Sequence, residues 1–264
     1  MRPVIITRPE PEATQWVHQL EAAGQPAAPL PMMQIHPCRA AGAQAALRQA
    51  LRRLQDYQAF MFVSSNAVRH MALHLKAAPS SVTATARLWA PGPGTARTLL
   101  QQGFSADRID QPGPSALQFD SEALWAVVQP QIQPGTRVLV VRGSTAEADP
   151  ADCGHGRQWL AEQIMARGGQ VDFVPVYERN APVRTPELEH QIASLCNQQP
   201  VWLFSSSECL HNLVGLAPQQ PWDQQTALTT HPRIAEQARQ RGFNPVLETQ
   251  PTVRAIACSI KSLA

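Results

Sequence analysis

The sequence predicts an α/β protein built from two similar parallel-sheet domains of the flavodoxin-like or Rossmann-like kind. The first observation is an internal repeat, because "FMFVSSNAVRHMALHL" at residues 60–75 returns as "VWLFSSSECLHNLVGL" at residues 201–216. The second is that each copy passes from β-branched and aromatic residues, through a polar turn, to apolar positions at helical spacing. Strands and helices that alternate at this short spacing indicate parallel sheets covered on both faces.

Three modules recur in the same order along the chain, which predicts a pseudo-duplicated architecture. In the first pair, an apolar strand and an arginine lead through an amphipathic helix ending in glycine to a second strand. The second pair is the repeat quoted above, and the third pair again has the strand–turn–helix pattern. The paired ranges are residues 2–37 with 136–182, 60–75 with 201–216, and 86–115 with 226–252.

Serine and glycine occupy the predicted helix ends. The serines at positions 64–65 and 205–207 lie where a strand passes into a helix, and there a hydroxyl can accept a hydrogen bond from a first-turn amide. Glycine is expected to end four helices, because it tolerates the positive φ common at that position. These glycines are Gly24, Gly103, Gly168 and Gly242.

Proline-rich extended segments follow the second strand of each half, around Pro37, Pro182 and Pro186. Such segments are typical of linkers and edge strands, so we expect the chain to cross twice between the domains. Residues 144–155 interrupt the helical pattern and are expected to form a surface loop insertion.

Composition excludes several classes of protein. The chain has 264 residues, a formal net charge of +2, 44% hydrophobic and 16% charged residues, which is a globular composition. Its apolar runs are strand-sized, and the N-terminus lacks an export signal, so we expect a cytoplasmic protein with no membrane span. Five scattered cysteines also favour a reducing compartment. The sequence has no cluster of basic residues interleaved with aromatic ones, so we do not expect nucleic-acid binding.

Six predicted turns at the carboxyl ends of strands could bind an anion, because exposed amides and the helix dipole both favour negative charge there. A ligand with several carboxylates could contact many of these turns at once. For any single turn, helix capping alone remains the alternative. The candidate binding residues are Arg8, Ser64, Ser65, Asn66, Thr95, Arg142, Gly143, Ser205, Ser206, Ser207, His231 and Arg233.

Other chemistries lack their motifs. The turn at residues 92–94 lacks the third glycine of a dinucleotide-binding fingerprint, and no phosphate-binding loop of the Gly-x-x-x-x-Gly-Lys type occurs. His70 and His74 lie four apart but no glutamate follows His70, so packing or solvent exposure is favoured over zinc. No serine lies in a Gly-x-Ser-x-Gly nucleophile motif. We therefore expect no metal, and the motifs do not favour nicotinamide or nucleotide triphosphate chemistry.

Tyr177 is one of only two tyrosines and lies at the end of an apolar strand. A phenol with an ordinary pKa of about 10 is protonated at neutral pH and can donate to a departing hydroxyl without a metal. The alternative is a packing role, with the hydroxyl bonded to a backbone carbonyl.

An ordered set of motifs across nearly the whole chain resembles the uroporphyrinogen-III synthase family. No single motif is diagnostic, and the resemblance rests on their order and spacing. The motifs are Ile-Thr-Arg-Pro at 6–9, Phe-Val-Ser-Ser-Asn-Ala-Val at 62–68, Gly-Pro-Gly-Thr-Ala at 92–96, Asp-Ser-Glu-Ala-Leu at 120–124, Val-Arg-Gly at 141–143, Val-Tyr-Glu-Arg at 176–179 and Phe-Ser-Ser-Ser at 204–207.

The resemblance implies a cofactor-free hydro-lyase that binds linear hydroxymethylbilane. We also expect a monomer. Such an enzyme closes the macrocycle to uroporphyrinogen III, inverting the terminal pyrrole through a spiro intermediate with loss of water. It also implies two α/β domains, residues 1–36 with 180–264 and residues 37–179, joined by a two-stranded connector and facing each other across an active-site cleft. Tyr177 falls on the family's motif tyrosine, thought to assist loss of the hydroxyl, and Thr95 on a cleft-facing threonine.

Two features depart from the family pattern. The second glycine-threonine turn is replaced by His-Pro-Arg-Ile at residues 231–234, so that Arg233 is a candidate for holding a carboxylate in place of a hydroxyl. The insertion at residues 144–155 interrupts a motif that is usually compact. A different class of function, a non-catalytic two-domain protein that binds a polyanionic small molecule, remains the alternative.

Overall fold

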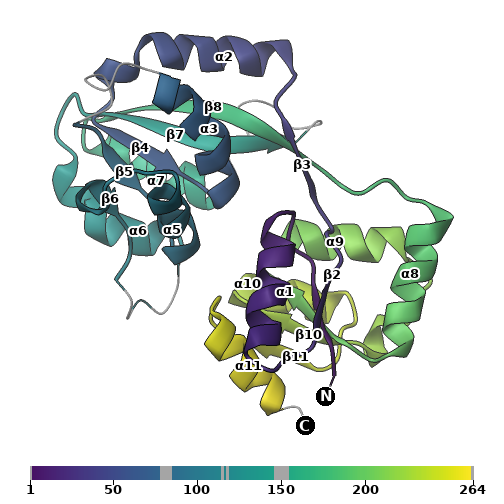
Figure 1. The fold of residues 1–264 in the computed structure, drawn as a ribbon. Coiled ribbons are helices and arrows are strands. Elements are labelled where there is room, and N and C mark those ends of the chain that lie inside the picture. The colour runs from purple at the N-terminus through teal and green to yellow at the C-terminus, as the bar shows by residue number, and fades with distance from the viewer. Residues whose placement is uncertain (1, 78–84, 114–115, 117–118, 146–154, 263–264) are drawn as a thin grey trace. The chain divides into compact units, whose positions relative to one another are not determined.

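The computed structural model describes residues 2–77, 85–113, 116, 119–145 and 155–262, which form a mixed α/β fold with parallel sheets. The chain divides into two compact units (Figure 1): unit 1 comprises Met1–Ile35 and Asn180–Ala264, and unit 2 comprises His36–Arg179. The chain leaves unit 1 at strand β3 (Gln34–Pro37) and returns at the end of β8 (Gln170–Asn180). These two strands are hydrogen-bonded neighbours.

Unit 1 contains a five-stranded sheet of order β11-β10-β9-β1-β2, and all its strand pairs are parallel. Its helices cover both faces of the sheet, as parallel strands require. The elements are β1 (Val4–Ile6), α1 (Glu12–Ala22), β2 (Ala27–Pro29), α8 (Pro186–Asn197), β9 (Val201–Phe204), α9 (Ser207–Leu216), β10 (Thr226–Thr229), α10 (Pro232–Gln240), β11 (Val246–Glu248) and α11 (Val253–Lys261).

Strand β9 shows how unit 1 fills its core. All four of its residues are buried, and successive side chains point to opposite faces of the sheet. Trp202 and Phe204 pack in a cluster with residues of α8, α9 and α10. Val201 and Leu203 pack in a second cluster with residues of α1 and α11. The continuous apolar run in the sequence therefore reflects burial on both faces.

Unit 2 contains a six-stranded sheet of order β3-β8-β7-β4-β5-β6. On one face of the sheet, Met61, Trp89 and Val140 pack against α6 and α7. Helix α3 contacts both α5 and strand β7. The elements are α2 (Ala41–Arg52), β4 (Ala59–Phe62), α3 (Ser65–Ala77), β5 (Arg87–Trp89), α5 (Pro93–Gln101), β6 (Ile109–Asp110), α6 (Ser121–Val128), β7 (Arg137–Thr145) and α7 (His155–Ala166).

Five strands of the unit 2 sheet follow the strand order of the unit 1 sheet, and β3 is an additional strand at the edge of the unit 2 sheet. The segment β1–α1–β2 occupies the place in unit 1 that β7–α7–β8 occupies in unit 2. Likewise β9, β10 and β11 correspond in order to β4, β5 and β6. These are the same three pairs of segments that repeat in the sequence.

The predicted helix ends are confirmed. Ser64 accepts a hydrogen bond from the amide of Ala67, and Ser206 caps α9 by accepting from the amide of Glu208, each at 3.2 Å. The four helix-ending glycines all have positive φ, between 78° and 97°. In the predicted insertion, residues 146–154 lie outside the described residues. Among the described helices, none combines the length and the apolar character that a bilayer crossing requires.

A carboxylate fixes the start of α2 to strand β8. One oxygen of Glu178 accepts hydrogen bonds from the backbone amides of Arg39, at 2.8 Å, and Ala40, at 3.3 Å. These bonds, the one from Arg39 above all, hold the pKa of Glu178 below its ordinary value. Glu178 thus takes the role of a helix cap from a distant part of the chain.

We predict that Glu178→Ala lowers the free energy of unfolding by about 1 kcal/mol at pH 7, the usual effect of losing a cap. Because the folded pKa is depressed, the contribution is present above the unfolded pKa of about 4.3 and is lost as pH falls through the folded pKa. Urea denaturation at pH 7 and at pH 4 or below checks this. Glu236→Ala, on an exposed part of α10, is the control, and a pH-independent difference would contradict the assignment.

Candidate active site at the carboxyl edge of each sheet

Parallel pairing places the carboxyl ends of the strands of a sheet along one edge, where ligands of α/β proteins usually bind. In unit 2 this edge carries the turns after β4 and β5 and the last residues of β7 and β8. In unit 1 it carries the turns after β1, β9 and β10. All the predicted binding residues and Tyr177 lie at these two edges.

Tyr177 lies at the edge of unit 2 and is 3% exposed. Its phenol oxygen lies 3.0 Å from the hydroxyl oxygen of Ser64, and either group can be the donor. Because Ser64 also accepts from the amide of Ala67, the pair is tied to the first turn of α3. The partner of the phenol is thus a side-chain hydroxyl rather than the backbone carbonyl of the packing alternative.

The Tyr177 ring lies directly over Gly143. A β-carbon at Gly143 would lie 2.4 Å from Cε2, 2.5 Å from Cζ and 2.9 Å from the phenol oxygen of Tyr177. Strands β7 and β8 shift register between Arg142 and Gly143, so that Arg142 pairs with Pro175 but Gly143 pairs with Tyr177. The bulge brings Tyr177 opposite the one residue that leaves room for its ring.

His70, on α3, completes the surroundings of the phenol. Its ring centroid lies 5.6 Å from that of Tyr177, with the rings tilted by 32°. Burial lowers the pKa of His70, and the charges of Arg69 and His74 lower it further. The sequence pattern alone favoured packing or solvent exposure for His70 and indicated no role at the phenol. The internal repeat held a signal, because His211 occupies the corresponding position of the second copy.

The remaining predicted residues of unit 2 lie around this centre. Ser65 donates to the carbonyl of Gly94, at 3.3 Å, which links the turns after β4 and β5. Asn66 is 8% exposed and accepts from Arg69 at 2.9 Å. Thr95 lies in the first turn of α5, 7% exposed. Arg142 is 3% exposed, with its guanidinium 5.8 Å from the Phe173 ring centroid.

The edge of unit 1 carries the other predicted residues. The Arg8 guanidinium contacts the helix that follows it, α1, donating to Glu12 at 3.3 Å and stacking on Trp16 at 4.8 Å. His231 accepts the amide of Arg233, at 3.1 Å, and caps α10, while the Arg233 side chain is exposed. Ser205, Ser206 and Ser207 form the turn into α9, which Ser206 caps.

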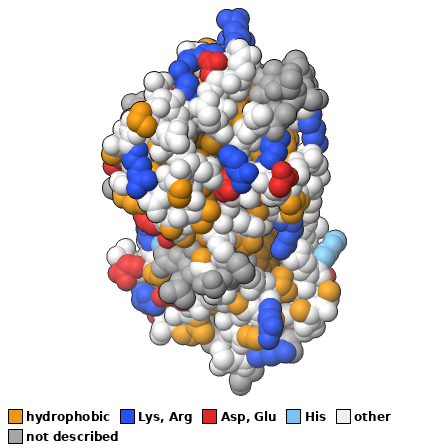
Figure 2. Space-filling model, turned by 90° about the vertical axis from the view of Figure 1, so that its left-hand side faces the viewer, with side chains coloured by type: hydrophobic (Ala, Val, Ile, Leu, Met, Phe, Trp, Pro, Cys, Tyr) orange, Lys and Arg blue, Asp and Glu red, His pale blue; other side chains and the backbone are white. Residues whose placement is uncertain are grey.

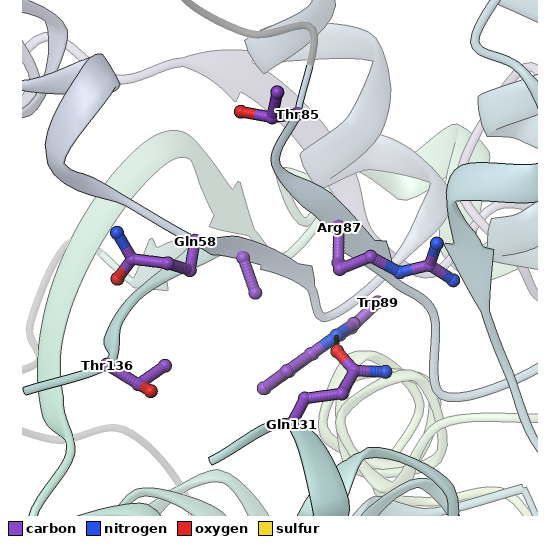
Figure 3. Close-up of a pocket in the computed structure, with 7 residues that line it drawn as sticks. Gln58, Thr85, Arg87, Trp89, Gln131 and Thr136 are labelled. Atoms are coloured by element: carbon purple, nitrogen blue, oxygen red, sulfur yellow. Dashed lines mark hydrogen bonds between the residues drawn. The ribbon is translucent and has the colours of Figure 1, made fainter. Parts of the chain in front are cut away.

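A pocket of about 460 Å³ lies at the opposite edge of the unit 2 sheet, where β4, β5 and β7 begin (Figure 3). Several of its polar groups form hydrogen bonds within the protein. The Trp89 indole donates to Gln131 at 3.0 Å. Asp110 accepts from Gln131 at 3.1 Å and from Arg87 at 2.8 Å. The oxygen of Gln58 accepts the amide of Arg137 at 2.8 Å. These bonds pair Gln58, Arg87, Trp89 and Gln131 of the lining with groups of the protein itself.

On the face drawn in Figure 2, basic side chains are scattered among acidic, polar and apolar ones. Within the described ranges, no three His, Cys, Asp or Glu side chains come together as metal ligands would. The groups gathered at the carboxyl edges are hydroxyls, backbone amides and arginines, which suit carboxylates.

We predict that Ser64→Ala lowers the free energy of unfolding by about 1 kcal/mol through loss of the cap and by roughly 1 kcal/mol more, because the buried Tyr177 hydroxyl loses this partner. Ser64→Thr keeps the oxygen and should remain close to wild type. Ser206→Ala is the matched control, since it removes a cap but no bond to a tyrosine. Equal losses for the two alanine variants in urea denaturation would contradict the Ser64–Tyr177 bond.

Relatives and a family model match the chain over most of its length. The family model described as "Uroporphyrinogen-III synthase HemD" matches residues 14–258. The uroporphyrinogen-III synthase of Escherichia coli (strain K12) is 25% identical over 255 residues, covering 92% of this chain and 93% of that protein. The enzyme of Salmonella typhimurium (strain LT2) is 26% identical over 250 residues, with the same coverage of both chains.

Solved structures share the fold. A uroporphyrinogen III synthase mutant from the extremely thermophilic bacterium Thermus thermophilus matches with a TM-score of 0.57, 15% identity, and coverage of 100% of this chain and 97% of that one. The uroporphyrinogen-III synthetase of Helicobacter pylori 26695 matches with a TM-score of 0.58, 16% identity, and coverage of 100% and 99%. The chain belongs to the uroporphyrinogen-III synthase family.

Proposed function

We propose that this protein is a uroporphyrinogen-III synthase, a lyase that converts linear hydroxymethylbilane to uroporphyrinogen III with loss of water. Membership of the family over residues 14–258 is the observation that carries this proposal. The position of Tyr177, buried at the carboxyl edge beside a second hydroxyl, supports its assignment as the catalytic acid. The reaction involves no net oxidation, so it needs no redox cofactor.

The substrate carries eight carboxylates, and we propose that amides and hydroxyls at the carboxyl edges of both units hold them. Each turn presents the start of a helix, where a negative charge gains about 0.3–1 kcal/mol. Binding through many such groups suits a protein with a net charge of only +2. In unit 2 the proposed contacts are Ser64, Ser65, Asn66, Thr95, Arg142 and Gly143. In unit 1 they are Arg8, Ser205, Ser206, Ser207, His231 and Arg233.

In the proposed reaction, Tyr177 donates its phenol proton to the departing hydroxyl, which leaves as water. Loss of water leaves an electrophilic methylene carbon on the first ring, and the substituted α-carbon of the terminal ring bonds to it, which gives the spiro intermediate. The earlier bond from that α-carbon to the methylene of the third ring then breaks. The freed methylene carbon bonds to the unsubstituted α-carbon of the terminal ring, which leaves this ring inverted. The final closure releases one proton as the pyrrole regains aromaticity, and this proton restores the phenol. Since the bilane can close unaided to the uninverted isomer, the enzyme's main task is to hold the ends of the substrate in one orientation.

The common strand order of the two sheets supports a further proposal, that the two units arose by duplication and are joined by β3 and β8 as a two-stranded connector.

We also propose that the monomer is the active form, because every group assigned above comes from a single chain. Sedimentation of the enzyme during turnover tests this proposal, and activity that sediments only with a dimer would contradict it.

We predict that the wild-type protein, supplied with hydroxymethylbilane made in a coupled assay, yields the type III isomer on analysis of the oxidised porphyrins. A positioned acid contributes about 10²–10⁴-fold to rate, so Tyr177→Phe should lower kcat by at least about 10²-fold. Tyr57→Phe is the control, because Tyr57 bonds to Asp172 away from the proposed acid. Tight binding of the bilane without conversion would instead favour the non-catalytic binding protein.

We predict that Arg233→Ala raises KM roughly tenfold and leaves kcat nearly unchanged, because a hydrogen bond to a charged group contributes about 1.5–3 kcal/mol and this side chain is exposed. Arg241→Ala, at the other end of the same helix, is the control. If Arg233→Ala left KM unchanged, or changed it no more than Arg241→Ala, this residue would not replace the missing hydroxyl contact.

A further inference from the structure

We propose that Gly143 is a positioning residue for the reaction: the β-bulge and the missing side chain at Gly143 together hold the Tyr177 phenol against Ser64. The expected effect on kcat rests on the proposed function, whereas the effect of Gly143 on the position of the phenol does not. It gives Gly143 a role distinct from contacting substrate through its backbone amide.

The bulge decides which residue Tyr177 meets. Residues paired on neighbouring strands point to the same face of a sheet. Continuing the register of Arg142 with Pro175 would pair Gly143 with Val176 and Ser144 with Tyr177. The observed pairing of Gly143 with Tyr177 leaves Val176 as the extra residue of β8. Bulges re-aim side chains in this way beside active sites.

The absence of a side chain then decides where the ring lies. Ring atoms occupy the space that a β-carbon at Gly143 would need, with a closest approach of 2.4 Å. Those atoms belong to the far end of a side chain, which can rotate away more easily than the strands can separate. Alanine at this position would therefore displace the phenol and spare the sheet.

In the native position, the Tyr177 phenol contacts Ser64 and His70. The phenol oxygen lies 3.0 Å from Ser64, and the His70 ring centroid lies 5.6 Å from that of Tyr177. Both residues come from the segment that begins α3, so the phenol lies between β7 and α3. Rotation away from Gly143 would break the bond to Ser64, and with it the alignment of the transferable proton.

The structural part can be tested by NMR, because the chain has only two tyrosines. With ring ¹³C-labelled tyrosine, Tyr177→Phe assigns the two signals. We expect Gly143→Ala to shift the Tyr177 signal and to leave that of Tyr57 in place. Gly215→Ala is the control, because no atom lies within 4 Å of a β-carbon built there. An unmoved Tyr177 signal in Gly143→Ala would overturn the proposal, whatever the protein's activity.

The kinetic part separates positioning from substrate contact. Alanine keeps the backbone amide, so a binding role alone would survive in Gly143→Ala. We expect kcat to fall at least tenfold with KM changed less than threefold, and expect Gly143→Ala to add little to the loss already caused by Tyr177→Phe. Multiplicative losses in the double variant would contradict action through Tyr177.

Gly169→Ala controls for crowding. A β-carbon there would lie 2.6 Å from Ile164 and 3.2 Å from the carbonyl of Thr136, so this variant is also strained, but near the start of β8. We expect it to lower stability and to leave kcat per folded molecule unchanged. If Gly169→Ala lowered kcat as much as Gly143→Ala, the effect would be one of general packing and the proposal would fail. If wild type formed no type III isomer while the Tyr177 signal still shifted, only the proposed function would fail.

Discussion

The parallel alignment of the strands is the constraint on which the rest of the structure depends. Parallel strands need a helix between neighbours, and each such helix begins at the edge where the strands end. In both units this edge therefore collects first-turn amides, capping hydroxyls and the ends of buried strands. A polyanion can be bound there with few fixed cations, which accords with a net charge of +2. The opposite edge of unit 2 bonds its own polar groups to one another.

The edge of unit 2 differs from that of unit 1 in carrying a buried phenol within a small group of interacting side chains. Tyr177 of β8 contacts three residues there: Ser64 in the turn before α3, His70 on α3 and Gly143 on β7. Such an arrangement fixes the phenol oxygen by a hydrogen bond and by packing together. For a reaction that competes with an easy unaided closure, fixed orientation matters as much as acid strength. The neighbouring Glu178 ties the same strand to the start of α2.

Much of the fold was predictable because its signals are local. The quoted repeat marks β4 and β9 with their helices, and the glycines at positions 24, 103, 168 and 242 mark helix ends with positive φ. The Ser64–Tyr177 bond was not predictable, because it joins residues 113 apart, and neither was the bulge that sets Gly143 beneath the ring. Sequence spacing does not show register between strands. The contacts of Arg8 with Glu12 and Trp16 of α1 were likewise not evident from the sequence.

The proposal that amides at the carboxyl edges of the two sheets hold one polycarboxylate is tested most directly by amide chemical shifts. Uroporphyrin III, which bears eight carboxylates, would be titrated into ¹⁵N-labelled protein. The account predicts that the amides of residues 64–66, 92, 94, 95 and 143 in unit 2 and of residues 205–207, 231 and 233 in unit 1 shift with one common dissociation constant. Shifts confined to one unit, or centred on Gln58, Arg87 and Thr136 at the opposite edge, would contradict it.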